Sequence, residues 1–157
     1  MKKNDIVEAM ITDISFPNKG KGTAADMPVT VKNTIPGQSV KIRITKKREG
    51  SLEGELREII ERSPLETEEG CSHKDLCGGC NYQRLSYKDE IELKKNMVLK
   101  ILKNAGIEDF IFEGIIPAPE KSSYRNKCEF SFGDSEKDGD LCLGMRKRGS
   151  FYEVVTL

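Results

Sequence analysis

Hydrophobic and polar residues alternate along the first third of the chain, a pattern typical of half-buried β-strands. In the segment 40–45, valine and isoleucine alternate with lysine, arginine and threonine. We predict strands at the segments 6–14, 27–33, 40–45 and 52–60, with turn signals at 18–22, 36–37 and 49–51. Several short strands separated by glycine- and proline-containing turns predict a small β-barrel over roughly the first 60 residues.

The middle of the chain contains the strongest helical pattern, from Tyr87 to Ala105. Ser86 is a suitable N-cap, and Gly106 lies where a C-terminal glycine usually ends a helix. The apolar positions that share one predicted face are Ile91, Val98, Ile101, Leu102 and Ala105. The lysines at 94, 95, 100 and 103 are distributed over the rest of the surface. We therefore expect an amphipathic helix.

The last part of the chain returns to β patterns. We predict strands at 110–117, 124–133, 140–149 and 150–157, the last two forming a hairpin that turns near 147–150. The predicted fold class is therefore mainly β with one long helix: an N-terminal barrel followed by a small α+β region. We place the boundary between the two domains after residue 62, giving domains 1–62 and 63–157.

Composition adds little until its distribution is considered. The chain has 157 residues, 26 Lys and Arg against 26 Asp and Glu, and no tryptophan. The basic residues are in excess over residues 1–60 and the acidic ones over 61–80, so a neutral total does not exclude nucleic acid, which needs only a local basic face. No apolar run approaches the roughly 20 residues of a membrane helix, and no signal peptide is recognisable. We expect a cytoplasmic protein with no membrane partner.

Three of the five cysteines, Cys71, Cys77 and Cys80, form a C-x5-C-x2-C pattern. In a reducing compartment such a cluster predicts metal binding rather than disulfides. A zinc site usually has two C-x2-C pairs, or one pair with two histidines. Here there is one pair and a single histidine, His73, which we interpret as a loop residue. Three clustered cysteines with a distant fourth are more typical of an iron–sulfur cluster.

The two remaining cysteines lie in predicted strands. Alternation places Cys128 on the same face as Phe130 and Phe132, and leucines flank Cys142 on both sides. We interpret both as buried core cysteines. Either one remains an alternative fourth ligand. Cys128 lacks the accessible electropositive setting of a catalytic thiol, so we expect no catalytic residue in this chain.

Several stretches resemble one family of RNA-modifying enzymes. The segment "FPNKGKG … NTIPGQSVKIRITKKREGSLEGELREIIERSP" is similar to a TRAM domain, a five-stranded OB-like barrel that binds RNA. "CSHKDLCGGCNYQRLSYKDEIELKK" resembles the cluster segment of the RNA (uracil-5-)-methyltransferases. "YRNKCEFSFG" and "LGMRKRGSFYEVV" are similar to the central β-domain of that family. The most specific part is C-x5-C-G-G-C followed by Tyr82, Gln83 and Tyr87.

The resemblance implies transfer of a methyl group from S-adenosylmethionine to C5 of a uracil in 23S ribosomal or transfer RNA. It implies a 4Fe-4S cluster held by Cys71, Cys77 and Cys80, with the fourth cysteine of the family beyond Leu157. The family's cofactor-binding catalytic domain would also follow Leu157. We therefore expect the RNA-recognition portion of such an enzyme, inactive alone, whose cluster is absent or replaced by zinc if the fourth ligand is missing.

The expected RNA contacts come from both halves of the chain, where cations bind phosphates and aromatic rings stack on unpaired bases. On the barrel they are Lys19, Lys21, Lys46, Lys47 and Arg48, with Phe16 as a stacking candidate; in the second half they are Tyr124, Arg125, Lys127, Arg146, Lys147 and Arg148. The alternative is a freestanding zinc-containing RNA-binding or ribosome-associated protein. A radical enzyme fragment ranks last, because those enzymes place a C-x3-C-x2-C cluster before the TRAM domain.

Overall fold

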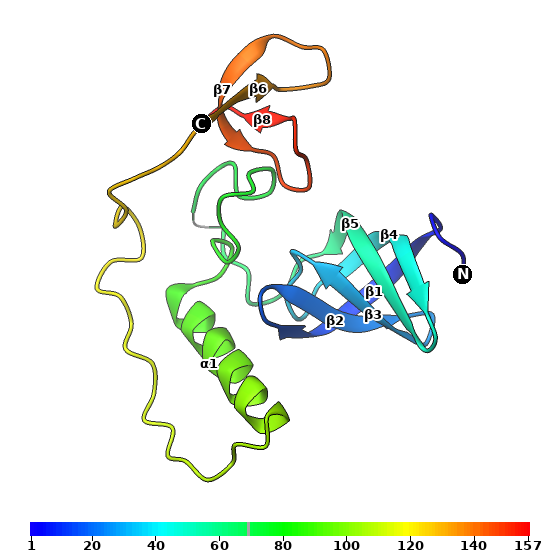
Figure 1. Cartoon of the computed structure of the whole chain (residues 1–157), viewed down its shortest axis with the longest axis vertical. Helices are drawn as coiled ribbons and strands as arrows, with labels where there is room; N and C mark the ends of the chain where they lie inside the picture. Colours follow the sequence, from blue (N-terminus) through cyan, green and yellow to red (C-terminus); the bar gives the residue numbers. More distant parts are fainter. Residues whose placement is uncertain (69) are drawn as a thin grey trace. The chain divides into compact units, whose positions relative to one another are not determined.

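The computed structural model describes residues 1–68 and 70–157. These residues form two compact units (Figure 1). The first comprises residues 1–66 and 92–112, and the second comprises residues 67–91 and 113–157. The helix therefore begins in one unit and ends in the other. The domain boundary after residue 62 stays a prediction.

The first unit contains a closed five-stranded barrel, as the fold class predicted. Its strands are β1 (Ile6–Ser15), β2 (Lys19–Ala24), β3 (Met27–Lys32), β4 (Ser39–Arg48) and β5 (Ser51–Glu61). They lie in the order β1-β2-β3-β5-β4, and β1 pairs with β4 to close the barrel. All neighbours are antiparallel except β3 and β5, which are parallel. A closed barrel leaves no unpaired sheet edge.

The alternating apolar side chains of β4 fill part of the barrel interior. Val40, Ile42 and Ile44 are fully buried, while the residues between them face outward. They pack with Ile11, Val31 and other apolar residues in one continuous core. Burying each of these side chains contributes about 1.5–3 kcal/mol. The core therefore holds the outer lysines and arginines on a stable framework.

One barrel strand differs from the sequence prediction. Residues 18–22 were expected to form a turn, but Lys19–Ala24 form β2. A Cβ atom on Gly22 would lie 1.8 Å from the carbonyl oxygen of Met10 on β1. The glycine therefore serves the close approach of two strands, not a turn. The lysines on either side of it consequently lie on a strand.

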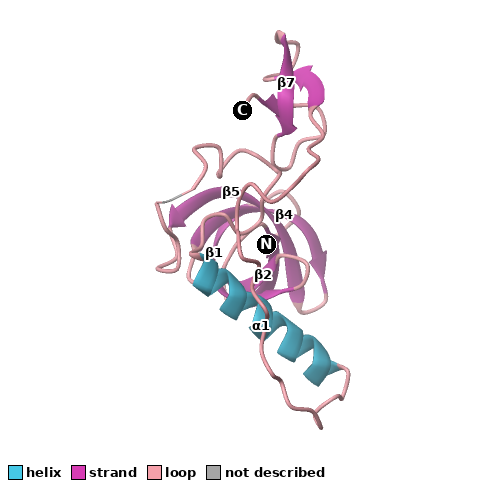
Figure 2. Ribbon diagram, turned by 90° about the vertical axis from the view of Figure 1, so that its left-hand side faces the viewer, coloured by secondary structure: helices cyan, strands magenta, loops and turns pink. Residues whose placement is uncertain are grey.

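Helix α1 spans Tyr87–Asn104, close to the predicted range. The Ser86 hydroxyl accepts a hydrogen bond from the N–H of Asp89 at 3.1 Å, which caps the first turn as predicted. Gly106 follows the helix with a φ of +73°. Figure 2 shows the helix as one uninterrupted element. Both predicted ends are confirmed.

The predicted apolar face of the helix is wrong. Its buried side chains are Leu93 and Met97, one turn apart, whereas Val98 is 42% exposed and Ile101 is 48% exposed. The helix carries more than one apolar stripe, and periodicity alone does not decide which one packs. Lys100 of this helix forms an ion pair with Asp13 of β1 within the first unit.

The second unit contains a three-stranded antiparallel sheet of β6 (Ser131–Asp134), β7 (Leu141–Arg146) and β8 (Val154–Val155). The predicted hairpin of the last two strands is confirmed. The strand predicted at 110–117 is absent, and the one at 124–133 is reduced to β6. Residues 110–130 have no partner strand among the described residues, so alternation there yields no ladder. No described helix is long and apolar enough to cross a membrane.

Candidate nucleic-acid interface and cysteine loop

Cys71, Cys77 and Cys80 lie on one tight loop in the second unit. The loop is built by local backbone bonds: the N–H groups of Leu76 and Cys77 both donate to the carbonyl oxygen of His73. His73 is thus a residue of this turn, which agrees with its interpretation as a loop residue. All five cysteines carry free thiols.

Two of the three sulfurs accept backbone hydrogen bonds. The N–H of His73 lies 3.4 Å from the Sγ of Cys71, and the N–H of Gly79 lies 3.3 Å from the Sγ of Cys77. Burial raises the pKa of the Cys80 thiol, and the neighbouring Cys77 and Cys71 sulfurs raise it further. Arg125 and Arg148 act in the opposite direction. The sulfurs of Cys71 and Cys77 are therefore close enough to act on the Cys80 thiol.

The donor chemistry suits a soft metal, but the ligand set is incomplete. Three thiols with N–H donors to two sulfurs match the preference of zinc and iron–sulfur centres for thiolate. However, no group of three or more His, Cys, Asp or Glu side chains among the described residues is arranged to hold a metal ion. The loop therefore supplies thiol ligands in a suitable environment, but by itself it does not form a complete metal site.

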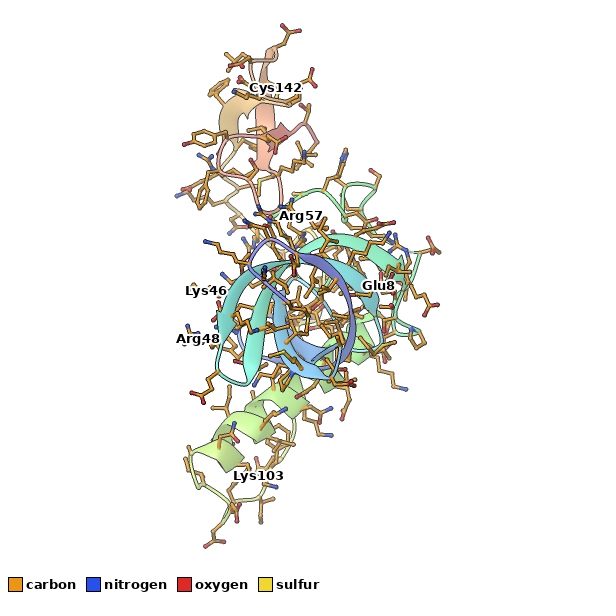
Figure 3. The ribbon with its side chains drawn as sticks, turned by 90° about the vertical axis from the view of Figure 1, so that its right-hand side faces the viewer. Glu8, Lys46, Arg48, Arg57, Lys103 and Cys142 are labelled. Atoms are coloured by element: carbon orange, nitrogen blue, oxygen red, sulfur yellow. The ribbon has the colours of Figure 1, made fainter. Side chains whose placement is uncertain are left out.

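The two other cysteines do not both lie where the sequence predicted. Cys128 is exposed and lies outside any strand, so its interpretation as a buried core residue is wrong. Its expected apolar neighbours are exposed too, Phe130 by 51% and Phe132 by 72%. Cys142 lies on β7, half-buried, and its thiol donates to the carbonyl oxygen of Gly133 at 3.2 Å. Figure 3 places Cys142 on the small sheet.

A second segment, distant in sequence, holds the cysteine loop. Cys77 forms a β-bridge with Lys147. The N–H of Gly78 donates to the carbonyl oxygen of Arg146 at 2.9 Å, and the N–H of Arg148 donates to the carbonyl oxygen of Leu76 at 2.7 Å. The residues after β7 therefore pair with the loop as a short antiparallel strand.

The Arg148 side chain adds to this pairing. Its Nη2 lies 3.0 Å from the carbonyl oxygen of Cys77 and 2.5 Å from that of Cys80. Its Nε is buried and has no hydrogen-bond partner among the described residues. Burial lowers the pKa of Arg148, as does the nearby Arg84 cation, while the Cys77 and Cys80 sulfurs favour its charged form.

The predicted RNA contacts on the barrel fall into two groups. Lys19 on β2 lies directly opposite Lys32 on β3, and both are exposed on the outer face. Lys21, two residues further along β2, faces the same way. Lys19 and Lys32 form no ion pair within the described part of the chain, whereas Lys21 lies opposite Asp13 on β1 and its charge acts on that carboxyl. Like charges opposite each other on two strands are unfavourable unless an anion neutralises them.

Phe16 extends this lysine face. It lies in the connection between β1 and β2, its ring is 68% exposed, and the peptide bond to Pro17 is cis. An exposed ring in the connection that leads into Lys19 offers a stacking surface near phosphate ligands. We call Phe16, Lys19, Lys21 and Lys32 the β2–β3 patch.

Most cations on β4 and β5 are instead paired with carboxylates. Lys46 and Arg48 both pair with Glu53, at 3.9 and 3.1 Å. The other pairs on these strands are Lys41–Glu58 at 2.8 Å, Arg43–Glu55 at 2.6 Å and Arg57–Glu55 at 3.3 Å. Lys47 donates to the carbonyl oxygen of Met1 at 3.2 Å. Figure 3 shows Lys46 and Arg48 pointing away from the barrel. Exposed pairs of this kind add little stability, but they reduce the local positive charge.

The cations of the second unit are also engaged to different degrees. Lys127 pairs with Glu129 at 2.6 Å, and Lys147 pairs with Glu153 at 2.9 Å. Arg146 donates to the carbonyl oxygen of Phe151. Arg125 remains fully exposed, with its guanidinium carbon 5.8 Å from the centre of the Tyr124 ring. Tyr124 and Arg125 are therefore both accessible to a base.

Lys32 was not among the residues predicted to contact RNA. The alternation of the segment 27–33 contains the signal, because Val29 and Val31 are buried and Lys32 is therefore outward-facing. Its importance depends on the register of β2 against β3, and β2 was interpreted as a turn. Without that register, Lys32 could not be placed beside Lys19.

The barrel is similar to a known class of domain: residues 2–56 match the model of the TRAM domain. More of the chain is similar to longer proteins. An uncharacterized RNA methyltransferase of Caldanaerobacter subterraneus subsp. tengcongensis is 44% identical over 155 residues, and one of Clostridium acetobutylicum is 41% identical over 155 residues. One of Bacillus cereus is 26% identical over 158 residues. These matches cover 99–100% of this chain and 34% of each relative, so the chain spans about a third of their length.

Proposed function

We propose that this chain is the RNA-recognition portion of a cytoplasmic RNA methyltransferase, and that the β2–β3 patch of its TRAM barrel contacts the RNA backbone. The observation that carries the proposal is the pairing of Lys19 with Lys32. Two exposed lysines face each other with no carboxylate between them, so a phosphate group would relieve their repulsion. Phe16 beside them would stack on an unpaired base.

The finer proposal concerns the reaction of the longer protein. We infer a methyl transfer from S-adenosylmethionine to C5 of a uracil in 23S ribosomal or transfer RNA. The support is the RNA methyltransferase names of the relatives together with the C-x5-C-G-G-C loop. C5 of uracil becomes nucleophilic when a thiolate adds to C6, which requires a reactive cysteine next to the methyl donor. We propose that this cysteine lies outside these 157 residues and that the part of this chain is to bind and orient the RNA.

We also propose that Cys71, Cys77 and Cys80 are three ligands of a 4Fe-4S cluster, with the fourth ligand supplied from outside these 157 residues. The support is the thiolate donor set and the N–H groups directed at two of its sulfurs. A bound cluster would cross-link the cysteine loop, and methyl transfer itself needs no redox step. The residues of this chain would hold the loop, as Arg148 does.

The test of the proposed function uses the longer protein. RNA methylated by the intact protein is digested and analysed by mass spectrometry for 5-methyluridine. We expect that product with the intact protein and its loss, by about tenfold or more, when Lys19 and Lys32 are both replaced by glutamine. Methylated adenine, guanine or cytosine in place of 5-methyluridine would overturn the uracil assignment. Full methylation by the double variant would overturn the role of the patch.

A further inference from the structure

The cysteine loop receives its backbone support from residues about 70 positions later in the chain. Residues 76–78 pair with 146–148 through the Cys77–Lys147 bridge and two backbone hydrogen bonds. Lys147 in turn donates its N–H to the carbonyl oxygen of Glu153, which continues the pairing of β7 with β8. The loop is therefore attached as an additional edge to the small sheet.

This backbone pairing ends before Cys80. The bridge fixes Cys77 and Gly78, but no backbone hydrogen bond between Cys80 and the segment 146–148 is present among the described residues. What joins both ends of the turn is the Arg148 side chain. A single terminal nitrogen, Nη2, donates to Cys77 and to Cys80. Because one planar amino group carries both hydrogens, the two carbonyl oxygens must face the same side of the turn.

Arginine is suited to this task for a geometric reason. Its guanidinium is planar and always charged, and its N–H groups point in fixed directions. Lysine would keep the charge and lose the fixed directions. Hydrogen bonds from a charged donor to the carbonyls are also stronger than neutral ones. The side chain thus sets where the two backbone carbonyls point.

We propose that Arg148 is a positioning residue for the Cys77–Cys80 turn, and that it holds the two thiols ready for a common metal. The metal part rests on the proposed function; the positioning of the turn does not. Arg148 carries this role in addition to, or in place of, the RNA contact that the sequence suggested. The residue acts on the ligands through their carbonyl groups and touches no sulfur in the hydrogen bonds described.

Arg125 provides a matched control. Both arginines lower the pKa of the Cys80 thiol through their charge. Only Arg148 donates hydrogen bonds to the turn; Arg125 donates to the hydroxyl of Tyr124. Replacing each by glutamine removes the same charge, and only Arg148→Gln removes the two bonds. A comparison of the two variants therefore separates hydrogen bonding from electrostatics.

The experiment has a metal-free arm and a metal arm, both under anaerobic, reducing conditions. Amide hydrogen exchange of Gly78 and Gly79 is measured by NMR in the metal-free chain. We expect Arg148→Gln to accelerate exchange by about tenfold or more, and Arg125→Gln to leave it nearly unchanged. Co²⁺ is then titrated and followed by its thiolate charge-transfer absorbance. We expect Arg148→Gln to weaken Co²⁺ binding by about 10–100-fold, as for other groups that orient ligands.

Protection of the Met145 and Val155 amides on β7 and β8 shows whether a variant still folds. If Arg148→Gln loses that protection, Arg148→Lys takes its place, and an exchange rate between those of the wild type and a frayed turn supports the proposal. Unchanged exchange at Gly78 and Gly79 in a folded Arg148→Gln chain overturns the positioning role. Equal acceleration in Arg125→Gln overturns it as well. If the wild type binds no Co²⁺, the proposed metal site fails, and the exchange data still decide the role of Arg148.

Discussion

The Nη2 atom of Arg148 lies 2.5 Å from the carbonyl oxygen of Cys80, although 68 positions separate the two residues. The contact joins the two features of the second half that are most conspicuous in the sequence, the C-G-G-C turn and the Arg-Lys-Arg run. The sequence suggested one as a metal site and the other as an RNA contact. In the structure they form one element, in which part of the basic run supports the cysteine loop.

The first prediction concerns Gly78, which lies against the backbone of the segment 146–148. A Cβ atom on Gly78 would lie 3.0 Å from the carbonyl oxygen of Arg146, a backbone atom with little room to move. We expect Gly78→Ala to cost about 1 kcal/mol of stability in the second unit, at the lower end of overpacking effects. Hydrogen exchange of the β7 and β8 amides measures this cost.

Gly79→Ala is the matched control in the same turn. Its Cβ would meet the flexible methyl end of Met145 at 3.1 Å and the Cys77 sulfur at 3.4 Å, so we expect the smaller effect. Equal effects of the two alanines would mean that Gly78 is not held against the segment 146–148.

The second prediction is a pH dependence in the first unit. Burial by itself would raise the pKa of Asp13, but the hydrogen bond from Lys100, the N–H of Ile14 and the Lys100 charge together lower it below 3.8. A lowered carboxyl pKa stabilises the folded state above the unfolded pKa, and this contribution is lost as pH falls through the folded value. Both side chains are more than a third exposed, so we expect about 0.2–1 kcal/mol.

Asp13→Asn should therefore reduce helix stability at pH 7 and make no difference at a pH well below 3.8. Hydrogen exchange of the α1 amides, extrapolated to each pH, measures the effect. Asp26→Asn is the control, since Asp26 is an exposed residue in the turn between β2 and β3. A difference between Asp13→Asn and wild type that persisted at low pH would show that the ion pair is not its cause.

The third prediction compares the exposed apolar face of the small sheet with the buried core of the barrel. Phe132 and Leu143 are directly opposite each other on β6 and β7, yet they are 72% and 48% exposed. We expect Phe132→Ala to cost less than about 1 kcal/mol, the range of a cross-strand pair. Ile42→Ala in the barrel core should cost about 2–5 kcal/mol. Urea unfolding of each unit measures both costs, and a cost for Phe132 as large as that for Ile42 would mean that the sheet face is covered in solution.

The barrel was predictable because the alternation that indicates each strand lies within a few consecutive residues. Alternation along 40–45 determines which side chains face inward, and the same rule applies to the other strands that were recognised. The Gly-Lys-Gly motif of β2 was misleading, since glycine favours turns but also permits the close approach that Gly22 makes to Met10. The helix ends were predictable from Ser86 and Gly106, whereas its buried face depended on a partner that the sequence does not specify.

In the candidate sites too, local features were predictable from the sequence, whereas contacts between distant residues were not. The three cysteines were recognisable from spacing, which is local. The exposure of Cys128 was not, because its predicted strand needed a partner that residues 124–130 lack. The contrast between unpaired Lys19 and neutralised Lys46 depends on which strands lie side by side. Likewise, the role of Arg148 depends on a contact across most of the second half, which no local pattern indicates.

RNA binding through the β2–β3 patch is the central claim, and it leads to the fourth prediction. A fluorescent single-stranded, uridine-containing RNA is titrated with the chain at several salt concentrations. Lys19→Gln with Lys32→Gln is compared with Lys41→Gln and Lys46→Gln, a double variant with the same change in net charge on the strands where glutamates already pair with these lysines.

We expect weaker binding for the Lys19 and Lys32 variant, with a log–log salt slope shallower by about 0.7 for each lysine. The reason is that each lysine would release one counterion on binding. We expect little change for the Lys41 and Lys46 variant, because those cations contribute less free positive charge. If both double variants weaken binding equally, only net charge matters and the β2–β3 patch is not an RNA site. If wild-type binding is absent at low salt, the proposal that this barrel recognises RNA is wrong.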